Sequence, residues 1–257
     1  MTKIISVANR KGGVGKTTTA INIATAMAAV GQKVAVIDLD PQGNATTSMG
    51  IQKDDKTPNV YKLMAEMNTV SEAFVETCVP DFYIVPASAD LAGAEIELIN
   101  VENREYVLKK CLSNVDKSID YIFIDCPPSL NLLTINALTA SDSVIVPLQC
   151  EFLALEGLTD LLRNINKIKK KFNPKLGLQG VVLTMYDKRN NLSQMVEKDV
   201  RKYFGNKVYE TVIPRNVRVS EAPSHGKPVL LYDLKCPGSQ AYISLAREVL
   251  KREEIIK

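Results

Sequence analysis

Short apolar runs, rich in β-branched residues and bounded by polar positions, alternate along the chain with longer helical segments. The short runs predict buried strands. They occupy Ile4–Ala8, Val34–Ile37, Tyr83–Val85, Tyr121–Ile124, Ser143–Pro147, Gly180–Thr184 and Val208–Ile213. The segments between them predict helices at 17–30, 91–113, 131–139, 154–171, 192–204 and 238–253.

This alternation predicts an α/β fold with a mostly parallel sheet and helices on both of its faces. We find no internal repeat and no low-complexity linker, so we expect residues 1–257 to form a single domain. Ligands of such sheets bind at the carboxyl ends of the strands. The loops that follow the first, second and fourth predicted strands therefore carry the candidate chemistry.

Composition excludes several classes of protein. The chain has 257 residues, of which 46% are hydrophobic and 24% charged, as is ordinary for a soluble globular protein. No apolar run approaches the roughly 20 residues that span a bilayer, and the N-terminus lacks a signal-peptide layout, so we expect a cytoplasmic location. Five scattered cysteines and one histidine, His225, argue against a disulfide framework, a zinc site or a Ser-His-Asp triad.

The net charge of +3 hides a segregation of charge. Residues 38–106 contain 13 acidic and 4 basic residues, whereas residues 160–220 contain 14 basic and 5 acidic residues. Such segregation produces a local field even when the total charge is small. The basic segment indicates either a polyanionic partner or a set of solvated helix faces, and charge alone leaves both open.

The loop after the first predicted strand has the features of a phosphate-binding P-loop. It follows an apolar strand and opens an alanine-rich helix. Gly12, Gly13 and Gly15 allow the backbone to wrap phosphate oxygens, and the amides there stabilise negative charge. Lys16 would reach the β and γ phosphates, and the Thr17 hydroxyl would bind magnesium.

Two residues of this loop depart from the ordinary P-loop. Arg10 stands where the strict pattern has glycine. Lys11 is a second lysine that an ordinary P-loop does not need. It is either a cation that reaches a nucleotide held by another subunit or a solvated lysine.

Three aspartates follow the second and fourth predicted strands. Asp38 and Asp40 come after the second strand, and they would share one face if that strand continued to Asp40. Either would position water or hold magnesium through its hydration shell. Asp125 follows the fourth strand, which is the Walker B layout. An aspartate at a strand end is also a common cap, but after a convincing P-loop we favour the nucleotide interpretation.

Four segments together resemble the ParA/Soj chromosome-partitioning ATPases. They are Lys11-Gly12-Gly13-Val14-Gly15-Lys16-Thr17-Thr18, the run from Asp38 to Asn44, the run from Asp125 to Ser129, and the run from Val212 to Pro228. This family belongs to the deviant Walker A group, which also includes MinD and the nitrogenase iron proteins. The resemblance runs nearly end to end and implies a three-layer P-loop NTPase fold.

The resemblance also implies roles for individual residues. Lys11, Lys16 and Asp40 would be catalytic, with Lys11 contacting the partner subunit's ATP and Asp40 positioning the attacking water. The nucleotide would be held by Lys11, Gly12, Gly13, Val14, Gly15, Lys16, Thr17 and Thr18, with Pro214 and Asn216 beside the adenine. Magnesium would bind Thr17, Asp125 through water, and Asp38. DNA would bind Arg189 and Arg218, with Lys198 and Lys202 as further candidates.

The implied cofactors are ATP and Mg²⁺, and the implied partners are a second copy of the chain, nonspecific double-stranded DNA and ParB. Mg-ATP would drive a sandwich homodimer that binds DNA, and hydrolysis stimulated by the basic N-terminal segment of ParB would release it. Such a protein would be nucleoid-associated and would partition a chromosome or plasmid. Basal ATP turnover would be slow, since the chain offers no obvious arginine finger.

Two other functions remain open. One is a MinD-like membrane-associated ATPase switch that positions division machinery. The tail Val249–Lys257 carries two acids and few large apolar anchors, so we expect no membrane binding. The other is a nucleotide-bound adaptor that hardly turns over. The sequence does not identify the replicon that would be segregated.

Overall fold

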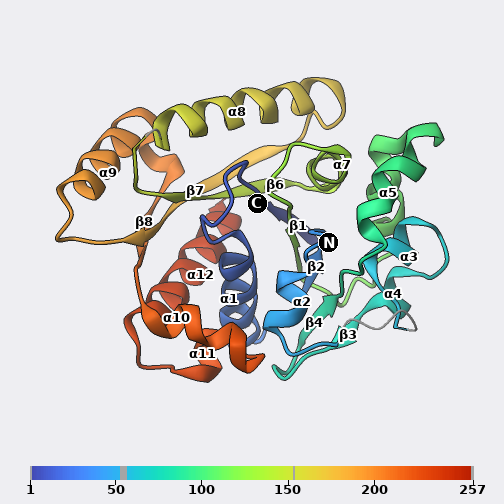
Figure 1. The fold of residues 1–257 in the computed structure, drawn as a ribbon, viewed down its shortest axis with the longest axis horizontal. Helices are drawn as coiled ribbons and strands as arrows, with labels where there is room; N and C mark the ends of the chain where they lie inside the picture. Colours follow the sequence, from blue (N-terminus) through green and yellow to red (C-terminus); the bar gives the residue numbers. More distant parts are fainter. Residues whose placement is uncertain (1, 53–56, 153, 256–257) are drawn as a thin grey trace.

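A computed structural model describes residues 2–52, 57–152 and 154–255, and these form one eight-stranded sheet with helices around it (Figure 1). The strand order is β3-β4-β2-β5-β1-β6-β7-β8. Neighbouring strands are parallel, except that β3 pairs antiparallel with β4. The strands are β1 Lys3–Val7, β2 Val34–Asp38, β3 Val75–Glu76, β4 Phe82–Val85, β5 Tyr121–Asp125, β6 Ser143–Gln149, β7 Gly177–Tyr186 and β8 Val208–Pro214.

The helices vary from single turns to nineteen residues. The α-helices are α1 Lys16–Ala28, α2 Asn44–Ser48, α3 Val60–Met64, α4 Val70–Ala73, α5 Leu91–Glu97, α6 Val107–Leu112, α7 Leu132–Ala140, α8 Ala154–Lys171, α9 Asn191–Phe204, α10 Val217–Glu221, α11 Val229–Tyr232 and α12 Pro237–Ile255. Four 3₁₀ turns join them: η1 Leu98–Asn100, η2 Arg104–Tyr106, η3 Gly205–Lys207 and η4 Ala222–His225.

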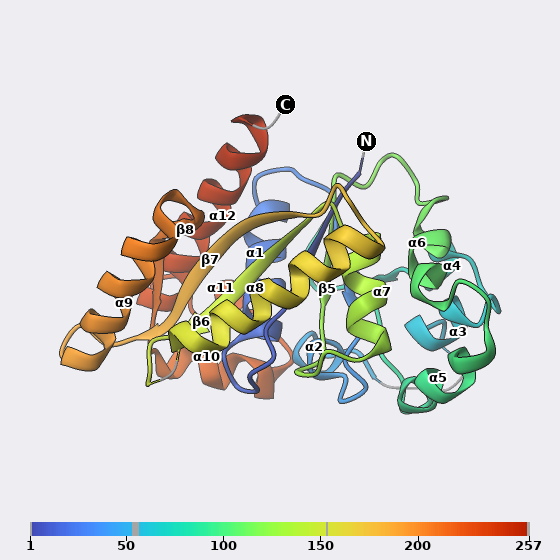
Figure 2. The ribbon, with the colours of Figure 1, turned by 90° about the horizontal axis from the view of Figure 1, so that it is seen from above.

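Two apolar cores lie on opposite faces of the sheet. Alternate residues of β2 show this directly, because Val34 and Val36 pack in one core and Ala35 and Ile37 in the other. Helices α1 and α12 cover the first core, and α7 and α8 contribute to the second. Figure 2 shows α8 in front of the sheet and α12 behind it. The expected three-layer fold with a mostly parallel sheet is confirmed.

The predicted helix over 91–113 is wrong as a single element. The structure divides it into α5, η1, η2 and α6. The helix stops because Val101 is extended, at φ −83° and ψ 128°, and Asn103 lies in the left-handed region at φ 55°. Residues on either side of such a break cannot continue one α-helical ladder. The short elements β3, α2, α3, α4, α10 and α11 were not predicted either.

The outer edge of the sheet at β8 is covered by side chains. From α9, Arg201 donates hydrogen bonds to the carbonyl oxygens of Tyr209 and Glu210, at 3.0 and 3.3 Å. From α12, the carboxylate of Glu248 accepts from the amides of Glu210 and Thr211, at 2.9 and 3.1 Å. Main-chain groups that an edge strand leaves unpaired are thereby occupied.

The chain order around β1 determines where a ligand site forms. The connection from β1 to β2 passes over β5 on one side, while β6 lies beside β1 on the other. This reversal of strand order opens a crevice at the carboxyl end of β1. The loop between β1 and α1 lies at that point, as the sequence predicts.

Candidate functional site

The loop between β1 and α1 has the backbone of a phosphate-binding turn. Gly13 and Gly15 have φ angles of 73° and 88°, a region that residues with a Cβ seldom adopt. The carbonyl oxygen of Val14 accepts a 2.8 Å hydrogen bond from Thr184 Oγ1 of β7. Asn9 Nδ2 donates to the Pro147 carbonyl oxygen of β6 at 2.7 Å. These bonds hold the loop against β6 and β7.

Lys16 is the first residue of α1, and its side chain turns back into the loop. Nζ donates a 3.0 Å hydrogen bond to the carbonyl oxygen of Lys11. Burial lowers the pKa of Lys16, and the carboxylates of Asp125 and Asp40 oppose that shift. The ammonium group is thus enclosed by the loop with acidic groups nearby, which suits a cation that binds terminal phosphate oxygens.

The predicted magnesium ligands Thr17, Asp38 and Asp125 meet at the carboxyl ends of β2 and β5. Thr17 Oγ1 donates a 2.6 Å hydrogen bond to Asp125 Oδ2. Asp38 and Asp125 are register partners on these adjacent strands and are both fully buried. Burial raises the pKa of Asp38 to about 6 and raises that of Asp125 well above its usual value, and the nearby charge of Asp38 adds to the shift of Asp125.

Two oxygens at this point fit a bound cation. Asp38 Oδ1 and Asp125 Oδ1 are buried and have no hydrogen-bond partner. Among the described residues, no group of three or more His, Cys, Asp or Glu side chains forms a complete metal cage. Magnesium is usually held by one or two carboxylates together with substrate phosphates and water. The donor set therefore fits a metal that arrives with a nucleotide.

Asp38 is also fixed by a residue that the sequence analysis missed. Thr46 of α2 donates to Asp38 Oδ2 from its amide at 2.7 Å and from its hydroxyl at 2.6 Å. The same hydroxyl accepts from the Ala87 amide at 2.9 Å. The short helix α2, absent from the predicted elements, gives no periodic signal over five residues. These bonds make Asp38 an anchor of α2 as well as a candidate ligand.

Asp40 lies beyond the end of β2. The strand stops at Asp38, so the condition under which Asp38 and Asp40 share one strand face is not met. Asp40 lies in a turn, where Oδ1 accepts from the Gln42 amide at 3.0 Å and its carbonyl oxygen accepts from the Gly43 amide at 2.8 Å. Its carboxylate is nonetheless close enough to influence the pKa of Lys16.

Lys11 forms an ion pair with a second residue that the sequence analysis missed. Its Nζ contacts Oε1 of Glu151, which follows β6. Beside the pair lies a hollow of about 330 Å³, whose lining includes Val14 and the exposed ring of Phe152. Lys11 is thus at the rim of the loop, more than half exposed. A residue 140 positions away contacts it, a relation that no local motif reveals.

The two residues expected beside the adenine lie at the end of β8. Pro214 ends the strand, and Asn216 precedes α10 with a buried Oδ1 that has no partner. Pro214 lines a hollow of about 580 Å³ that Arg189 also lines, together with Tyr186, Asp187, Lys188, Val212, Arg215, Pro237 and Ala241. A predicted adenine residue and a predicted DNA residue therefore share one hollow, whereas Asn216 is not part of its lining.

The four predicted DNA-binding residues come from three neighbouring segments. Arg189 lies in the turn after β7 and its side chain is 90% exposed. Lys198 and Lys202 are exposed one turn apart on α9. Arg218 lies on α10. Figure 1 shows α9 and α10 at the same end of the molecule as β8.

Comparison with known proteins decides the family. Residues 2–178 match a family model described as an AAA domain. Over 253 residues the chain is 57% identical to the chromosome partitioning protein ParA of Caulobacter vibrioides, covering 98% of this chain and 95% of that protein. Over 249 residues it is 53% identical to the sporulation initiation inhibitor protein Soj of Bacillus subtilis, covering 97% and 98%. The chain belongs to the ParA/Soj family of chromosome-partitioning ATPases. The predicted family is confirmed.

Solved structures agree with this ParA/Soj fold. A Mycobacterium smegmatis protein named cobyrinic acid a,c-diamide synthase, with bound ATP analogue and magnesium, is similar with a TM-score of 0.87 and 39% identity, covering 100% of this chain and 98% of that one. MinD from Pyrococcus horikoshii, complexed with Mg-ADP, is similar with a TM-score of 0.80 and 26% identity, covering 99% and 98%.

Proposed function

We propose that this ParA/Soj family member partitions a chromosome or plasmid by an ATP-dependent cycle of dimerisation and DNA binding. The protein is an ATPase with ATP and Mg²⁺ as cofactors. The whole chain would act as one ATPase domain. The proposal rests on the position of Lys16, Thr17 and Asp125, which lie together at the carboxyl ends of the central strands.

The phosphate loop and the strand-end aspartates would each bind a different part of Mg-ATP. The amides of Gly12 to Thr18 would surround the phosphates, and Lys16 would bind their terminal oxygens. Thr17, Asp125 and Asp38 would hold magnesium, which would supply positive charge to the phosphates when bound. Asp40, held in its turn by Gln42, would orient water toward the terminal phosphate.

The exposed rim residue Lys11 would complete the site of a second copy. Its side chain is more than half exposed, and its Nζ contacts Glu151. In a sandwich dimer each Lys11 would exchange this carboxylate for the partner's ATP. Two ammonium groups at each nucleotide would stabilise the charge that develops on the transferred phosphoryl group.

DNA binding would follow dimerisation because two basic surfaces then face one duplex. Arg189, Arg218, Lys198 and Lys202 would neutralise backbone phosphates, so binding would depend little on sequence and strongly on salt. A ParB-type protein would stimulate hydrolysis and so release DNA. Such a protein would be cytoplasmic and associated with the nucleoid.

One experiment separates this cycle from its alternatives. DNA binding is measured with ADP, with ATP and with a nonhydrolysable analogue, beside phosphate release with DNA and ParB. The cycle requires tight binding with the analogue and weak binding with ADP, together with stimulated phosphate release. Equal affinity in all three nucleotide states would contradict it, and DNA binding without phosphate release would support an adaptor.

The likeness to MinD supports a membrane-associated switch as the second candidate. Relatives named as chromosome-partitioning proteins, at 57% identity in Caulobacter vibrioides and 45% in Thermus thermophilus, favour the first candidate. Within the described ranges, no helix is long and apolar enough to cross a membrane. The last two residues of the tail Val249–Lys257 lie outside the described residues. Sedimentation with anionic vesicles and ATP would detect a membrane switch.

A further inference from the structure

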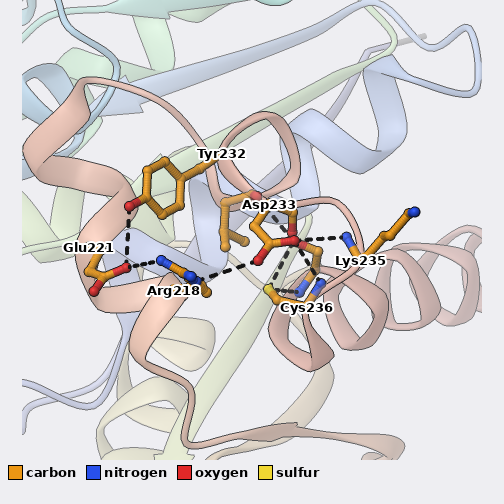
Figure 3. Close-up of polar contacts among 8 residues, drawn as sticks. Arg218, Glu221, Tyr232, Asp233, Lys235 and Cys236 are labelled. Atoms are coloured by element: carbon orange, nitrogen blue, oxygen red, sulfur yellow. Dashed lines mark hydrogen bonds and ion pairs between the residues drawn. The ribbon is translucent and has the colours of Figure 1, made fainter.

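The guanidinium group of Arg218 lies between two carboxylates of its own chain (Figure 3). Nη1 donates a 3.0 Å hydrogen bond to Glu221 Oε2 on the next turn of α10. Nε lies 3.5 Å from Asp233 Oδ2, which follows α11. One positive charge therefore faces two negative charges. The local sum is −1, at a residue proposed to bind a polyanion.

Further bonds fix both carboxylates in these positions. The Tyr232 hydroxyl donates to the same Glu221 oxygen at 3.2 Å. Asp233 Oδ1 accepts from the amides of Lys235 and Cys236, at 3.1 and 3.2 Å. The bonds to Tyr232 and to the two amides restrain the carboxylates beside the arginine. They do not depend on Arg218, so the acidic surroundings would persist if the arginine turned toward DNA.

The other predicted DNA-binding arginine has the same kind of partner. Arg189 binds Asp187 through two parallel contacts, Nε to Oδ1 at 3.0 Å and Nη2 to Oδ2 at 2.9 Å. Hydrogen bonding from Arg189 lowers the pKa of Asp187 to about 2, so this carboxylate is charged at neutral pH. By contrast, Lys198 and Lys202 make no ion pair with any described residue.

A carboxylate beside a phosphate-binding cation opposes DNA in two ways. It occupies the donors that would bind a phosphate oxygen, and its charge repels the duplex. Both arginines are more than half exposed, so each ion pair is weak enough to be exchanged for phosphate. The arrangement fits a surface whose affinity for DNA is lowered by the carboxylates but not abolished.

We propose that Glu221, Asp233 and Asp187 compete with DNA phosphate for Arg218 and Arg189, and so limit the affinity of each protomer for DNA. This inference rests on the proposed DNA-binding function and adds its regulation. Two protomers together would still bind because a dimer presents twice the number of cations. A single protomer would release DNA readily. The carboxylates thereby lower the DNA affinity of a single protomer and of the dimer, and the reduction is larger in the dimer because both protomers contribute to it.

The test neutralises the carboxylates without changing their shape. The variants are E221Q/D233N and, at the separate arginine, D187N. Each new amide retains an oxygen that accepts hydrogen bonds, so the local fold is preserved. The matched control is E76Q/E102Q, which makes the same change in net charge. Glu76 lies in β3, at the opposite edge of the sheet from β8.

DNA affinity is measured by titrating the full-length protein against a short duplex at several salt concentrations, with ADP and with an ATP analogue. We expect E221Q/D233N to bind roughly tenfold more tightly than wild type, the scale of relieving exposed ion pairs in both protomers. With ADP, where a single protomer binds, the gain should be roughly threefold, because only one protomer's ion pairs are relieved. D187N should gain a smaller factor, and the control should match wild type within about twofold.

Two results would overturn the inference in distinguishable ways. If wild type binds DNA and E221Q/D233N and D187N bind no more tightly than E76Q/E102Q, the competition is absent while the proposed function stands. If wild type and every variant fail to bind DNA in either nucleotide state, the proposed DNA step is itself wrong, and the inference falls with it.

Discussion

The Thr17 hydroxyl donates a 2.6 Å hydrogen bond to Oδ2 of Asp125, although the two residues are 108 positions apart. The bond joins the first turn of α1 to the end of β5. Both residues are predicted magnesium ligands, and each comes from a different motif. Their contact is the physical connection between the phosphate loop and the strand-end carboxylate.

Replacing Lys16 by alanine should weaken nucleotide binding. The buried ammonium group would no longer reach the terminal phosphates, and losing charge-assisted hydrogen bonds should lower ATP affinity roughly 10- to 100-fold. Titration with a fluorescent ATP analogue measures this. Lys33→Ala, an exposed lysine beyond the far end of α1, serves as the control. Unchanged ATP affinity in Lys16→Ala would remove Lys16 from the phosphate site.

Asp40→Ala should slow hydrolysis and leave ATP binding in place. A residue that orients the attacking nucleophile contributes on the order of 10²-fold or more to the rate. The variant should therefore accumulate as an ATP-bound dimer, which sedimentation velocity detects at saturating Mg-ATP. Normal turnover would exclude Asp40 from the chemical step. Sedimentation as single chains would argue against the nucleotide-driven dimer.

Arg189→Glu should weaken DNA binding while ATP binding persists. Because each protomer would neutralise one phosphate fewer, the slope of log affinity against log salt should fall in magnitude by about 1.8 for a dimer. Lys109→Glu is the control, since Lys109 is exposed on α6 and has the same sign of charge. An unchanged slope in Arg189→Glu would place the DNA-binding surface elsewhere.

Thiol reactivity should separate the cysteines. Burial raises the pKa of Cys126 and of Cys150 to about 12, whereas Cys78 is exposed. At pH 8 the thiolate fraction of the first two is roughly 10⁻⁴, so iodoacetamide should modify Cys78 first in native protein. Peptide mass spectrometry reads the sites. Modification of Cys126 as fast as Cys78 would show that burial does not protect the Cys126 thiol.

Gly226→Ala should lower the free energy of unfolding more than Gly31→Ala does. Both glycines have positive φ, 62° and 86°, so each substitution carries the same kind of backbone strain, about 1–2 kcal/mol. A Cβ on Gly226 would lie 2.8 Å from Gly50 Cα, whereas nothing lies within 4 Å at Gly31. The added overpacking should cost about 1–3 kcal/mol, measured by urea unfolding. Equal losses of unfolding free energy in the two variants would show that the loops carrying Gly226 and Gly50 move apart without cost.

The sequence predicted the layers of the fold because buried strands and long helices have strong apolar patterns. The sequence did not predict α2 and α10, because five residues are too few to show a helical repeat of apolar positions. The phosphate loop was found because its chemistry is continuous in the chain. Thr46, Glu151 and Asp233 were missed because they reach their partners through tertiary folding. Glu221 lies only three residues from Arg218, but the short helix that pairs them was itself not predicted.

The side chains of Arg201 and Glu248 along β8 have a consequence for assembly. They occupy amides and carbonyls that a ninth strand would need, so the sheet of one molecule is not readily extended by another at that margin. The proposed dimers, if bound side by side on DNA, would then stay separate molecules instead of joining their sheets into one continuous β-ribbon. Each pair could dissociate from its neighbours independently.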